Sequence, residues 1–502
     1  MNFETFTTLS EIYLEDLTVN ESSFLFKQLS EKKVDVFPDN SKFVFYNFNK
    51  VDNKILDHTV KILDYIDIPR FFVVVITNQE DTKNYFETLP EPICVITRDG
   101  TYEVGTVSEL SPEFNLDNHM CPYPWVGFWA FPDGAVSPCC EYTGKFKKDS
   151  GERFDIKTDS FADVVSSKEM QNLRDQFRNK KIPDGCKKCV RREELAGESR
   201  RSLSSYKLKS IYGNINWESD DIQIQYIGGH LGNICNLKCR ICDHEFSSKI
   251  AQENIKYNLN DVAKSKLAIK NNNWPAQEIN FWQELKERMP DIKSFEMLGG
   301  EPFAIKENVD FVNYVVDSGY AEVCEFDFST NGTIFPSFLN KDKKFRRMSV
   351  TVSIDNIGKK FELERHGAKW TGVEENIRRY VELSNQNSSF KVGICVTVSI
   401  LNILDLPEIL KWLKSINVSH YYFNILEGPE YFNVRYITRN TKQAVLSKIS
   451  NEPELQFIKE VLHDAPLSDG SEFRKQIELI DSIRSEKFSE THRDIWSSMS
   501  IV

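Results

Sequence analysis

The chain has 502 residues, of which 40% are hydrophobic, 12% aromatic and 27% charged. This composition is typical of a folded protein with sizeable apolar cores and argues against a disordered chain. The formal net charge of −12 argues against a broad phosphate-binding surface, so we expect no nucleic-acid partner. No apolar stretch approaches the roughly 20 residues that span a bilayer, and the first residues lack the pattern of a signal peptide. We therefore expect a cytoplasmic protein that does not associate with membranes.

A single core seldom grows past about 250 to 300 residues, so the chain is expected to form several domains. The first, residues 1–115, alternates strand-like and helix-like runs between residues 42 and 99. The strand-like runs are KFVFYNF, RFFVVVIT and PICVITRDG, and the helix-like runs are NKILDHTVKILDYI and EDTKNYFETL. This pattern predicts a small α/β domain, to which the sequence assigns no role.

Cysteines and turn residues dominate the second predicted domain, residues 116–215, together with one amphipathic helix over about 160–180. The chain has eleven cysteines, and in a reducing compartment clustered cysteines are better interpreted as metal ligands than as disulfides. Here Cys121 and Cys139 precede the pair Cys186 and Cys189, and Cys140 competes with Cys139. Four thiolates would close an iron-sulfur cluster completely, which indicates an electron-relay or structural role, whereas a zinc site of two cysteine pairs is the alternative.

Short β-branched or aromatic runs alternate with longer helical patterns across residues 216–440. The six runs are IQIQYI, SFEMLGG, EFDFSTN, SVTVSID, KVGICVTVSI and SHYYFNI. They predict an α/β fold built on a partial (β/α)6 barrel of the TIM type. The remaining residues, 441–502, are charged and helix-like and predict a helical C-terminal cap.

The segment CNLKCRIC places Cys235, Cys239 and Cys242 in a short loop directly after the first predicted barrel strand. Barrel enzymes carry their chemistry at the carboxyl ends of the strands, where this loop lies. A cubane cluster bound by only three thiolates leaves one iron open to another ligand. A zinc site is the alternative, although zinc sites normally take four ligands.

This triplet resembles the Cys-x3-Cys-x2-Cys hallmark of the radical S-adenosylmethionine (SAM) superfamily, over residues 222–436, with Ile241 where relatives often have an aromatic residue. The resemblance implies that the three cysteines hold a 4Fe-4S cluster that binds and reductively cleaves SAM. The 5'-deoxyadenosyl radical so formed would abstract hydrogen from a substrate. A reducing partner of the flavodoxin or ferredoxin type is also implied.

Four further segments follow the triplet in the order expected of the superfamily. MLGGEP carries Gly299, Gly300 and Glu301, which the resemblance assigns to the methionyl amino group of SAM. The other implied SAM contacts are Ser329, Asn331, Ser353, Asp355 and Arg365. Taken one at a time, these residues are equally compatible with tight turns, helix caps or a surface ion pair.

The first cysteine set resembles a SPASM or twitch auxiliary-cluster domain, because Cys121, Gly134 and Cys139 match its Cys-x9-15-Gly-x4-Cys opening. Relatives usually carry this domain after the barrel, whereas here it comes first. The resemblance implies one auxiliary 4Fe-4S cluster held by Cys121, Cys139, Cys186 and Cys189, besides the SAM-binding cluster. The cysteines at 94, 324 and 395 lie in apolar runs and are interpreted as small buried side chains.

The resemblance implies that the substrate is a peptide or protein, modified in the manner of a maturase. The N-terminal pattern does not match the winged helix that often binds leader peptides, so a small metabolite such as a sugar or nucleotide stays open. A non-catalytic iron-sulfur or zinc scaffold is a third possibility, against which the GGEP segment argues. The sequence identifies no catalytic acid, base or hydrogen donor.

Overall fold

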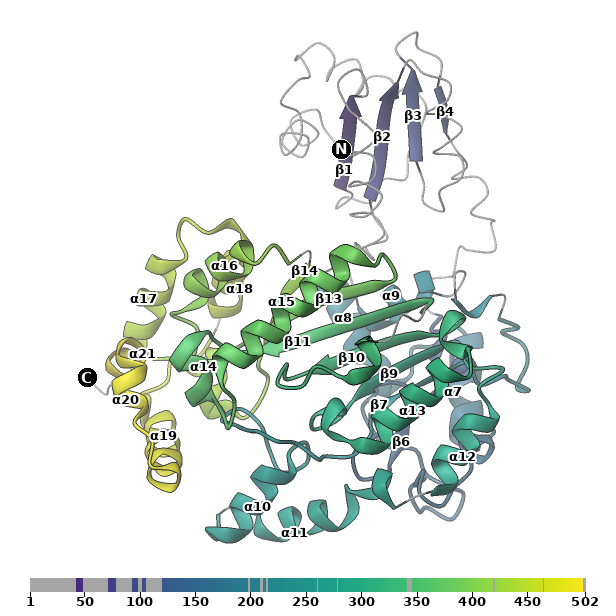
Figure 1. Ribbon diagram of the computed structural model, residues 1–502, viewed down its shortest axis with the longest axis horizontal. Helices are drawn as coiled ribbons and strands as arrows, with labels where there is room; N and C mark the ends of the chain where they lie inside the picture. The colour runs from purple at the N-terminus through teal and green to yellow at the C-terminus, as the bar shows by residue number, and fades with distance from the viewer. Residues whose placement is uncertain are drawn as a thin grey trace. The chain divides into compact units, whose positions relative to one another are not determined.

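The computed structural model describes the backbone of four strands between residues 42 and 104, and residues 120–499 apart from 197–198, 208–210, 214, 260, 278, 341–344, 419 and 464. The chain divides into two compact units, Met1–Met120 and Cys121–Val502 (Figure 1). The cysteine-rich segment, the strand–helix repeat and the C-terminal helices therefore belong to one unit.

The first unit contains a four-stranded sheet of β1 (Lys42–Asn47), β2 (Phe71–Thr77), β3 (Ile93–Thr97) and β4 (Tyr102–Val104). The first three strands are parallel, and β4 pairs with β3 in the antiparallel direction. The three predicted strands are thereby confirmed. The two predicted helices of this region lie outside the described residues.

The second unit is built on an eight-stranded sheet in the order β14-β13-β11-β10-β9-β7-β5-β6. The strands are β5 (Gly127–Ala130), β6 (Val136–Ser137), β7 (Tyr226–His230), β9 (Ser294–Leu298), β10 (Glu325–Thr330), β11 (Arg347–Ile354), β13 (Phe390–Val398) and β14 (His420–Ile425). Six of them, from β7 to β14, are parallel and adjacent in chain order. The predicted α/β fold with a parallel sheet is therefore confirmed.

The first strand of the repeat begins later than predicted. The sequence favoured residues 222–227, because IQIQYI alternates, but β7 runs from Tyr226 to His230. The neighbouring strands explain the shift, since both Gly127 of β5 and Ser294 of β9 lie opposite Tyr226. Gln223, inside the predicted strand, is exposed and hydrogen-bonds to Asp291 instead.

The central strands of the sheet have an apolar face that helices cover, whereas no residue of the edge strand β14 is buried. Side chains of β11 alternate between buried and half-buried, with Val350 buried and Thr351 half-buried. Helices α13 (Lys306–Asp317) and α15 (Trp370–Gln386) lie over the sheet in Figure 1. Phe311 of α13 packs edge-on against Phe295 of β9, with ring centroids 5.2 Å apart. The polar residues of the strands face the other side.

The cysteine-rich segment adds two strands to this sheet, which the sequence did not predict. Strand β5 pairs in parallel with β7, and β6 pairs with β5 in the antiparallel direction. The helix expected over about 160–180 is interrupted, forming α6 (Phe161–Val165) and α7 (Lys168–Arg178). Ser160 and Ser167 each cap the N-terminus of one of these helices, and serine caps favour starting a new helix over continuing the first.

The remaining helices lie at the periphery of the second unit. Between β7 and β9 the chain forms α10 (Ser248–Lys256), α11 (Val262–Asn271) and α12 (Ile279–Glu287), and α16 (Leu406–Ser415) follows β13. The C-terminal residues form α17 (Arg439–Lys448), α18 (Phe457–His463), α19 (Ser471–Arg484), α20 (Phe488–Thr491) and α21 (Arg493–Ser498). Helix α20 packs against α14 (Gly358–Glu364). Among the described residues, no helix is both long enough and apolar enough to cross a membrane.

Candidate functional site

The cysteine triplet lies in a loop that leaves the carboxyl end of β7. Within this loop, β8 (Lys238–Cys239) forms a two-stranded antiparallel ribbon with β12 (Arg365–His366), which follows α14. Arg365 is the direct partner of Cys239 in this ribbon. The ribbon therefore brings the middle cysteine of the triplet next to the arginine expected to contact SAM, although the two residues lie far apart in the sequence.

The three thiols of the triplet are held in a protein environment that favours their neutral form. Burial raises the pKa of Cys235, although the backbone N–H of Leu237 partly offsets this effect. Burial raises the pKa of Cys239 to about 12 against the opposing charge of Arg365. Burial likewise raises the pKa of Cys242 well above its usual range. Thiols of this kind become thiolates when a metal supplies the compensating positive charge.

The glycine pair after β9 packs directly onto the backbone of the cysteine loop. A Cβ on Gly300 would lie 2.4 Å from the carbonyl oxygen of Ile234 and 2.6 Å from that of Asn233. Gly299 is less crowded, since its Cβ would lie 3.3 Å from the carbonyl oxygen of Gly232. Only a residue without a side chain allows this approach at position 300.

Glu301 joins the ends of three strands. Its backbone N–H donates to the carbonyl oxygen of Ile234 at 2.9 Å. Its fully buried carboxylate accepts hydrogen bonds from Thr330 Oγ1 at 2.8 Å, from the Asn331 N–H at 2.7 Å and from the Phe303 N–H at 3.1 Å. Burial raises the pKa of Glu301 to about 7 in spite of these donors. Because both oxygens already accept bonds from the chain, this carboxylate orients the loops around it.

Asn331 connects the end of β10 to the cysteine loop. Its Nδ2 donates to Asn236 Oδ1 at 2.9 Å, and Asn236 is the neighbour of Cys235. Asn236 Nδ2 in turn donates to Thr333 Oγ1 at 2.8 Å. Sequence reasoning missed the roles of Asn236 and Thr330, because only the fold brings these common polar residues next to Asn331 and Glu301.

Asp355 and Arg365 form a buried ion pair at 2.9 Å, with their side chains 1% and 8% exposed. Arg365 Nε and Asp355 Oδ2 have no hydrogen-bond partner. Buried polar atoms are nearly always satisfied, so unpaired atoms on two neighbouring charged groups favour a ligand at this position. A cofactor with a carboxylate and hydroxyl groups, such as SAM, fits these donors and acceptors.

Ser329 and Ser353 lie farther along the same sheet, on its polar face. Both are half-buried residues of strands, Ser329 opposite Thr351 and Ser353 opposite Cys395. The structure therefore brings six of the eight predicted SAM residues into direct contact with one another or with the cysteine loop, while the two serines stand beside that group. The six are Gly299, Gly300, Glu301, Asn331, Asp355 and Arg365.

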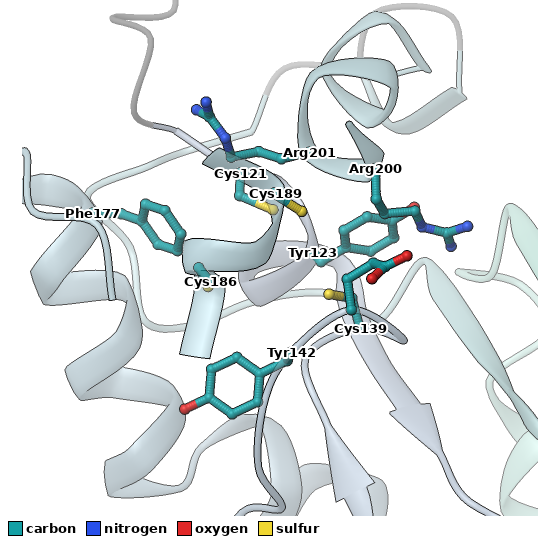
Figure 2. A pocket seen from close by; sticks show the side chains of 10 residues that line it. Cys121, Tyr123, Cys139, Tyr142, Phe177, Cys186, Cys189, Arg200 and Arg201 are labelled. Atoms are coloured by element: carbon teal, nitrogen blue, oxygen red, sulfur yellow. The ribbon is translucent and has the colours of Figure 1, made fainter. Parts of the chain in front are cut away.

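The second cysteine set lines a separate pocket, drawn in Figure 2. Its lining includes Cys121, Cys139, Cys186 and Cys189, the four residues expected to act as ligands. Three of these thiols are buried and Cys186 is half-buried. The segment that precedes α6 and the segment that follows α7 therefore meet at this pocket.

Turns and short helices deliver these four cysteines. Cys121 precedes α5 (Tyr123–Val126), and Cys139 follows β6. Gly134, in the turn between β5 and β6, has a φ of +87°, which an L-residue rarely adopts. Cys186 ends a 3-10 turn and Cys189 lies in the first turn of α8 (Lys187–Ala196). The spacing around Gly134 thus follows from a tight hairpin that returns the chain to the pocket.

Comparison with known proteins identifies this segment. Residues 121–190 match the model of the SPASM family, an iron-sulfur cluster-binding domain. This segment is similar to a SPASM domain and is called the SPASM domain below. It stands ahead of the six-stranded repeat, as the sequence predicted, and it supports the resemblance to radical SAM enzymes that carry such a domain. No curated protein matches the chain.

Solved structures give matches of low similarity. The anSMEcpe structure with bound AdoMet and the Cp18Cys peptide is 15% identical, with a TM-score of 0.29, over 47% of this chain and 61% of that one. Streptococcus suis SuiB is 12% identical, with a TM-score of 0.29, over 68% of this chain and 70% of that one. TYW1 with a lysine-pyruvate adduct is 13% identical, with a TM-score of 0.23, over 57% of this chain and 89% of that one. The chain spans about three fifths of the first of these structures.

Within the SPASM domain the thiols influence one another. Burial raises the pKa of Cys121, and the neighbouring Cys186 raises it further. Burial also raises the pKa of Cys139, with Cys121 as the next cause, and the pKa of Cys186, with Cys139 as the next cause. This mutual repulsion of thiolates is what a bound cationic centre relieves.

Cys140 is set apart from the other cysteines of the SPASM domain. It does not line the pocket, and burial raises its pKa to about 11 while the charge of Arg200 lowers it.

In the described part of the chain, no three His, Cys, Asp or Glu side chains form a group that could hold a metal ion. A four-iron cluster differs from a single ion because each thiolate binds a different iron.

Arg200 links the SPASM pocket to the sheet, and sequence reasoning did not single it out. Arg200 is one of the residues that line the pocket, and its Nη1 donates to Glu296 on the polar face of β9 at 3.0 Å. It also donates to the Tyr226 hydroxyl of β7 at 3.1 Å and lies 4.9 Å from the centroid of the Tyr123 ring. No spacing in the sequence connects Arg200 to Glu296, 96 residues away.

Proposed function

We propose that this protein is a radical SAM enzyme whose SAM-binding 4Fe-4S cluster is held by Cys235, Cys239 and Cys242. The observation that carries the proposal is that residues from distant parts of the sequence meet at one site. The cysteine loop, the GGE segment, Asn331 and Arg365 come from different parts of the sequence, and they contact one another at the carboxyl ends of β7, β9, β10 and β11. Isolated turns or caps at these positions would have no reason to meet.

The chain's own residues have separate roles in this proposal. Gly299 and Gly300 allow the backbone after β9 to approach the cysteine loop, and Glu301 and Asn331 hold the two loops together. Arg365 would receive the carboxylate of SAM through its unpaired Nε, and Asp355 would orient Arg365 and accept a hydrogen bond through its unpaired Oδ2. Ser329 and Ser353 would contact the ribose from the polar face of the sheet.

The bound cluster would supply one electron that cleaves SAM and yields a 5'-deoxyadenosyl radical able to abstract hydrogen from a substrate. The protein contributes binding, orientation and exclusion of water. The buried positions of Glu301, Asp355 and Arg365 suit that task, because a site lined by buried groups keeps competing hydrogen donors away. We propose a partial (β/α)6 barrel as the frame, with its polar face toward the substrate.

An auxiliary 4Fe-4S cluster in the SPASM domain is the second part of the proposal. Cys121, Cys139, Cys186 and Cys189 would ligate all four irons, which leaves none open to substrate and favours an electron-relay role. Arg200 connects this pocket to Glu296 on the polar face of the sheet. A flavodoxin or ferredoxin type of reductant would serve both clusters.

We further propose a peptide or protein as the substrate, because enzymes with auxiliary clusters of this kind commonly modify such molecules. The true substrate can be identified experimentally by its effect on the rate of SAM cleavage. A peptide substrate should raise the rate of 5'-deoxyadenosine formation above the rate without substrate. Stimulation by sugars or nucleotides alone would favour a small metabolite instead.

Anaerobic reconstitution with iron and sulfide tests the cofactor content. We expect about eight irons per chain, corresponding to two cubanes. The Cys186→Ala variant should retain about four, because it loses only the auxiliary cluster. Zinc bound in place of iron would contradict the proposal and favour a scaffold role.

A further inference from the structure

Two cationic residues flank Cys239 in the cysteine loop, and both are held by the C-terminal helices. The Arg240 side chain is 0% exposed, and its Nη2 contacts Asp481 at 2.5 Å and Glu486 at 2.6 Å. Its Nε donates to the carbonyl oxygen of Leu363 at 3.3 Å. A guanidinium this deeply buried is stable only where anionic partners surround it.

Lys238, on the other side of Cys239, is held through α19. Arg484, the last residue of that helix, donates from Nη1 to the Lys238 carbonyl oxygen at 2.8 Å. Arg484 also contacts Glu253 of α10 at 2.7 Å, and Glu253 contacts the Lys238 ammonium at 2.5 Å. Helices that are distant in sequence therefore hold both neighbours of the middle cysteine.

The second strand of the ribbon is held by the same segment. Glu486 Oε1 contacts Nδ1 of His366, the neighbour of Arg365, at 2.5 Å. His492 Nε2 contacts Glu364 at 2.8 Å, with both side chains buried. The Glu364 carbonyl oxygen accepts from the Arg240 N–H at 2.8 Å. Glu486 thus contacts β12 through His366 and the cysteine loop through Arg240.

We propose that residues 481–492 position the cluster site, with Glu486 as the positioning residue that sets Cys239 against Arg365. This proposal rests on the proposed function of the cysteine triplet. It assigns the C-terminal segment, shown beside α14 in Figure 1, a direct effect on the geometry of the cluster site.

The physical reason lies in the ribbon itself. Strands β8 and β12 contain two residues each, too few to hold their own register in water. Charge-assisted hydrogen bonds to buried groups are stronger than neutral ones, and their directions restrict how the ribbon tilts. Ser485, the C-cap of α19, has a φ of +54°, so the chain leaves the helix direction directly before Glu486.

The test compares Glu486→Gln with Glu490→Gln. Both changes remove one carboxylate from neighbouring positions, but Glu490 is exposed and pairs with Lys487 within three residues. In the metal-free chain, hydrogen exchange should become roughly tenfold faster for residues 236–243 and 361–368 in Glu486→Gln, because Arg240 loses a charged partner. Glu490→Gln should match the wild type. Equal exchange in both variants, or faster exchange that extends over 121–190, would overturn the proposal.

The second readout is cluster retention in the reconstituted chain. With an iron chelator, Glu486→Gln should lose iron from the triplet several-fold faster than the wild type, while the SPASM iron leaves at the wild-type rate. Glu486→Asp should restore most of the retention, because it keeps the charge. Equal loss from both sites would indicate general destabilisation and overturn the proposal. If the wild-type triplet takes up no iron, the proposed function fails, and the exchange experiment still decides whether Glu486 holds the ribbon.

Discussion

Arg365 stands opposite Cys239 in a two-residue ribbon and at the same time forms a buried ion pair with Asp355 at 2.9 Å. This single arginine therefore connects the cysteine loop after β7 to the end of β11. Its Nε and the Oδ2 of Asp355 are both left without partners. The pair is held ready for a polar ligand.

Replacing Arg365 tests whether SAM binding requires the adjacent N–H donors of its guanidinium. Arg365→Lys keeps the charge beside Asp355 but loses the paired donors, so we expect about tenfold weaker SAM binding with triplet iron retained. Arg365→Ala leaves the Asp355 charge buried and unpaired, which should lower the free energy of unfolding by about 3 kcal/mol. Calorimetric SAM titration and urea unfolding measure the two effects. The surface change Arg378→Lys should alter neither, and full SAM affinity in Arg365→Lys would contradict the assigned role.

Gly300→Ala tests the contact between the GGE segment and the cysteine loop. The new Cβ would lie 2.4 Å from the Ile234 carbonyl oxygen, so the two loops must separate, and we expect reduced iron at the triplet. Gly372→Ala is the matched control, since nothing lies within 4 Å of its Cβ and it occupies α15. That control should gain up to about 1 kcal/mol of stability. Unchanged triplet iron in Gly300→Ala would show that the close approach is unimportant.

Glu301 gives the metal-free chain a pH-dependent stability. Burial raises its folded pKa to about 7 from 4.5, so the folded state binds the proton more tightly than the unfolded state between these values. The free energy of unfolding should therefore fall as pH rises through this window, by on the order of 3 kcal/mol. Urea unfolding of Glu301→Gln should lack this component. Glu375→Gln, at an exposed position of α15, should keep it, and an identical pH profile for Glu301→Gln and the wild type would refute the account.

The adjacent cysteines of the SPASM domain should behave differently. Only Cys139 lines the pocket with the other three thiols, whereas Cys140 lies near Arg200. We expect Cys139→Ala to lose the auxiliary cluster, about four irons per chain, and Cys140→Ala to keep it. Iron analysis with Mössbauer spectroscopy separates the two clusters. Loss of auxiliary iron in Cys140→Ala alone would reverse the ligand assignment.

Several parts of the fold were predictable from sequence because they depend on local pattern. The β-branched runs of the repeat alternate or are continuously apolar, and they form strands β9 to β14 close to where they were expected. The cysteine spacings are also local, since the short loop of the triplet, the hairpin around Gly134 and the first turn of α8 contain them. The break between α6 and α7 is also encoded locally, in the cap at Ser167, but one uninterrupted helix was expected there from the sequence.

Other features depend on contacts that no local pattern reports. The pairing of β5 with β7 places the SPASM domain on the same sheet as the repeat, and it also explains why β7 starts at Tyr226. Glu301 was expected to contact the amino group of SAM, and no local pattern indicated that its carboxylate also accepts hydrogen bonds from Thr330 and Asn331. The contact of Glu486 with Arg240 joins residues 246 positions apart, so neither residue alone indicated it.

The most direct test of the central claim is anaerobic formation of 5'-deoxyadenosine. Reconstituted wild-type chain is supplied with dithionite and SAM, and the nucleoside is quantified beside Cys239→Ala, with Cys140→Ala as the control thiol. The account predicts the nucleoside from the wild type and from Cys140→Ala, and none above background from Cys239→Ala. Equal formation with Cys239→Ala, or no nucleoside from an iron-loaded wild type, would contradict it.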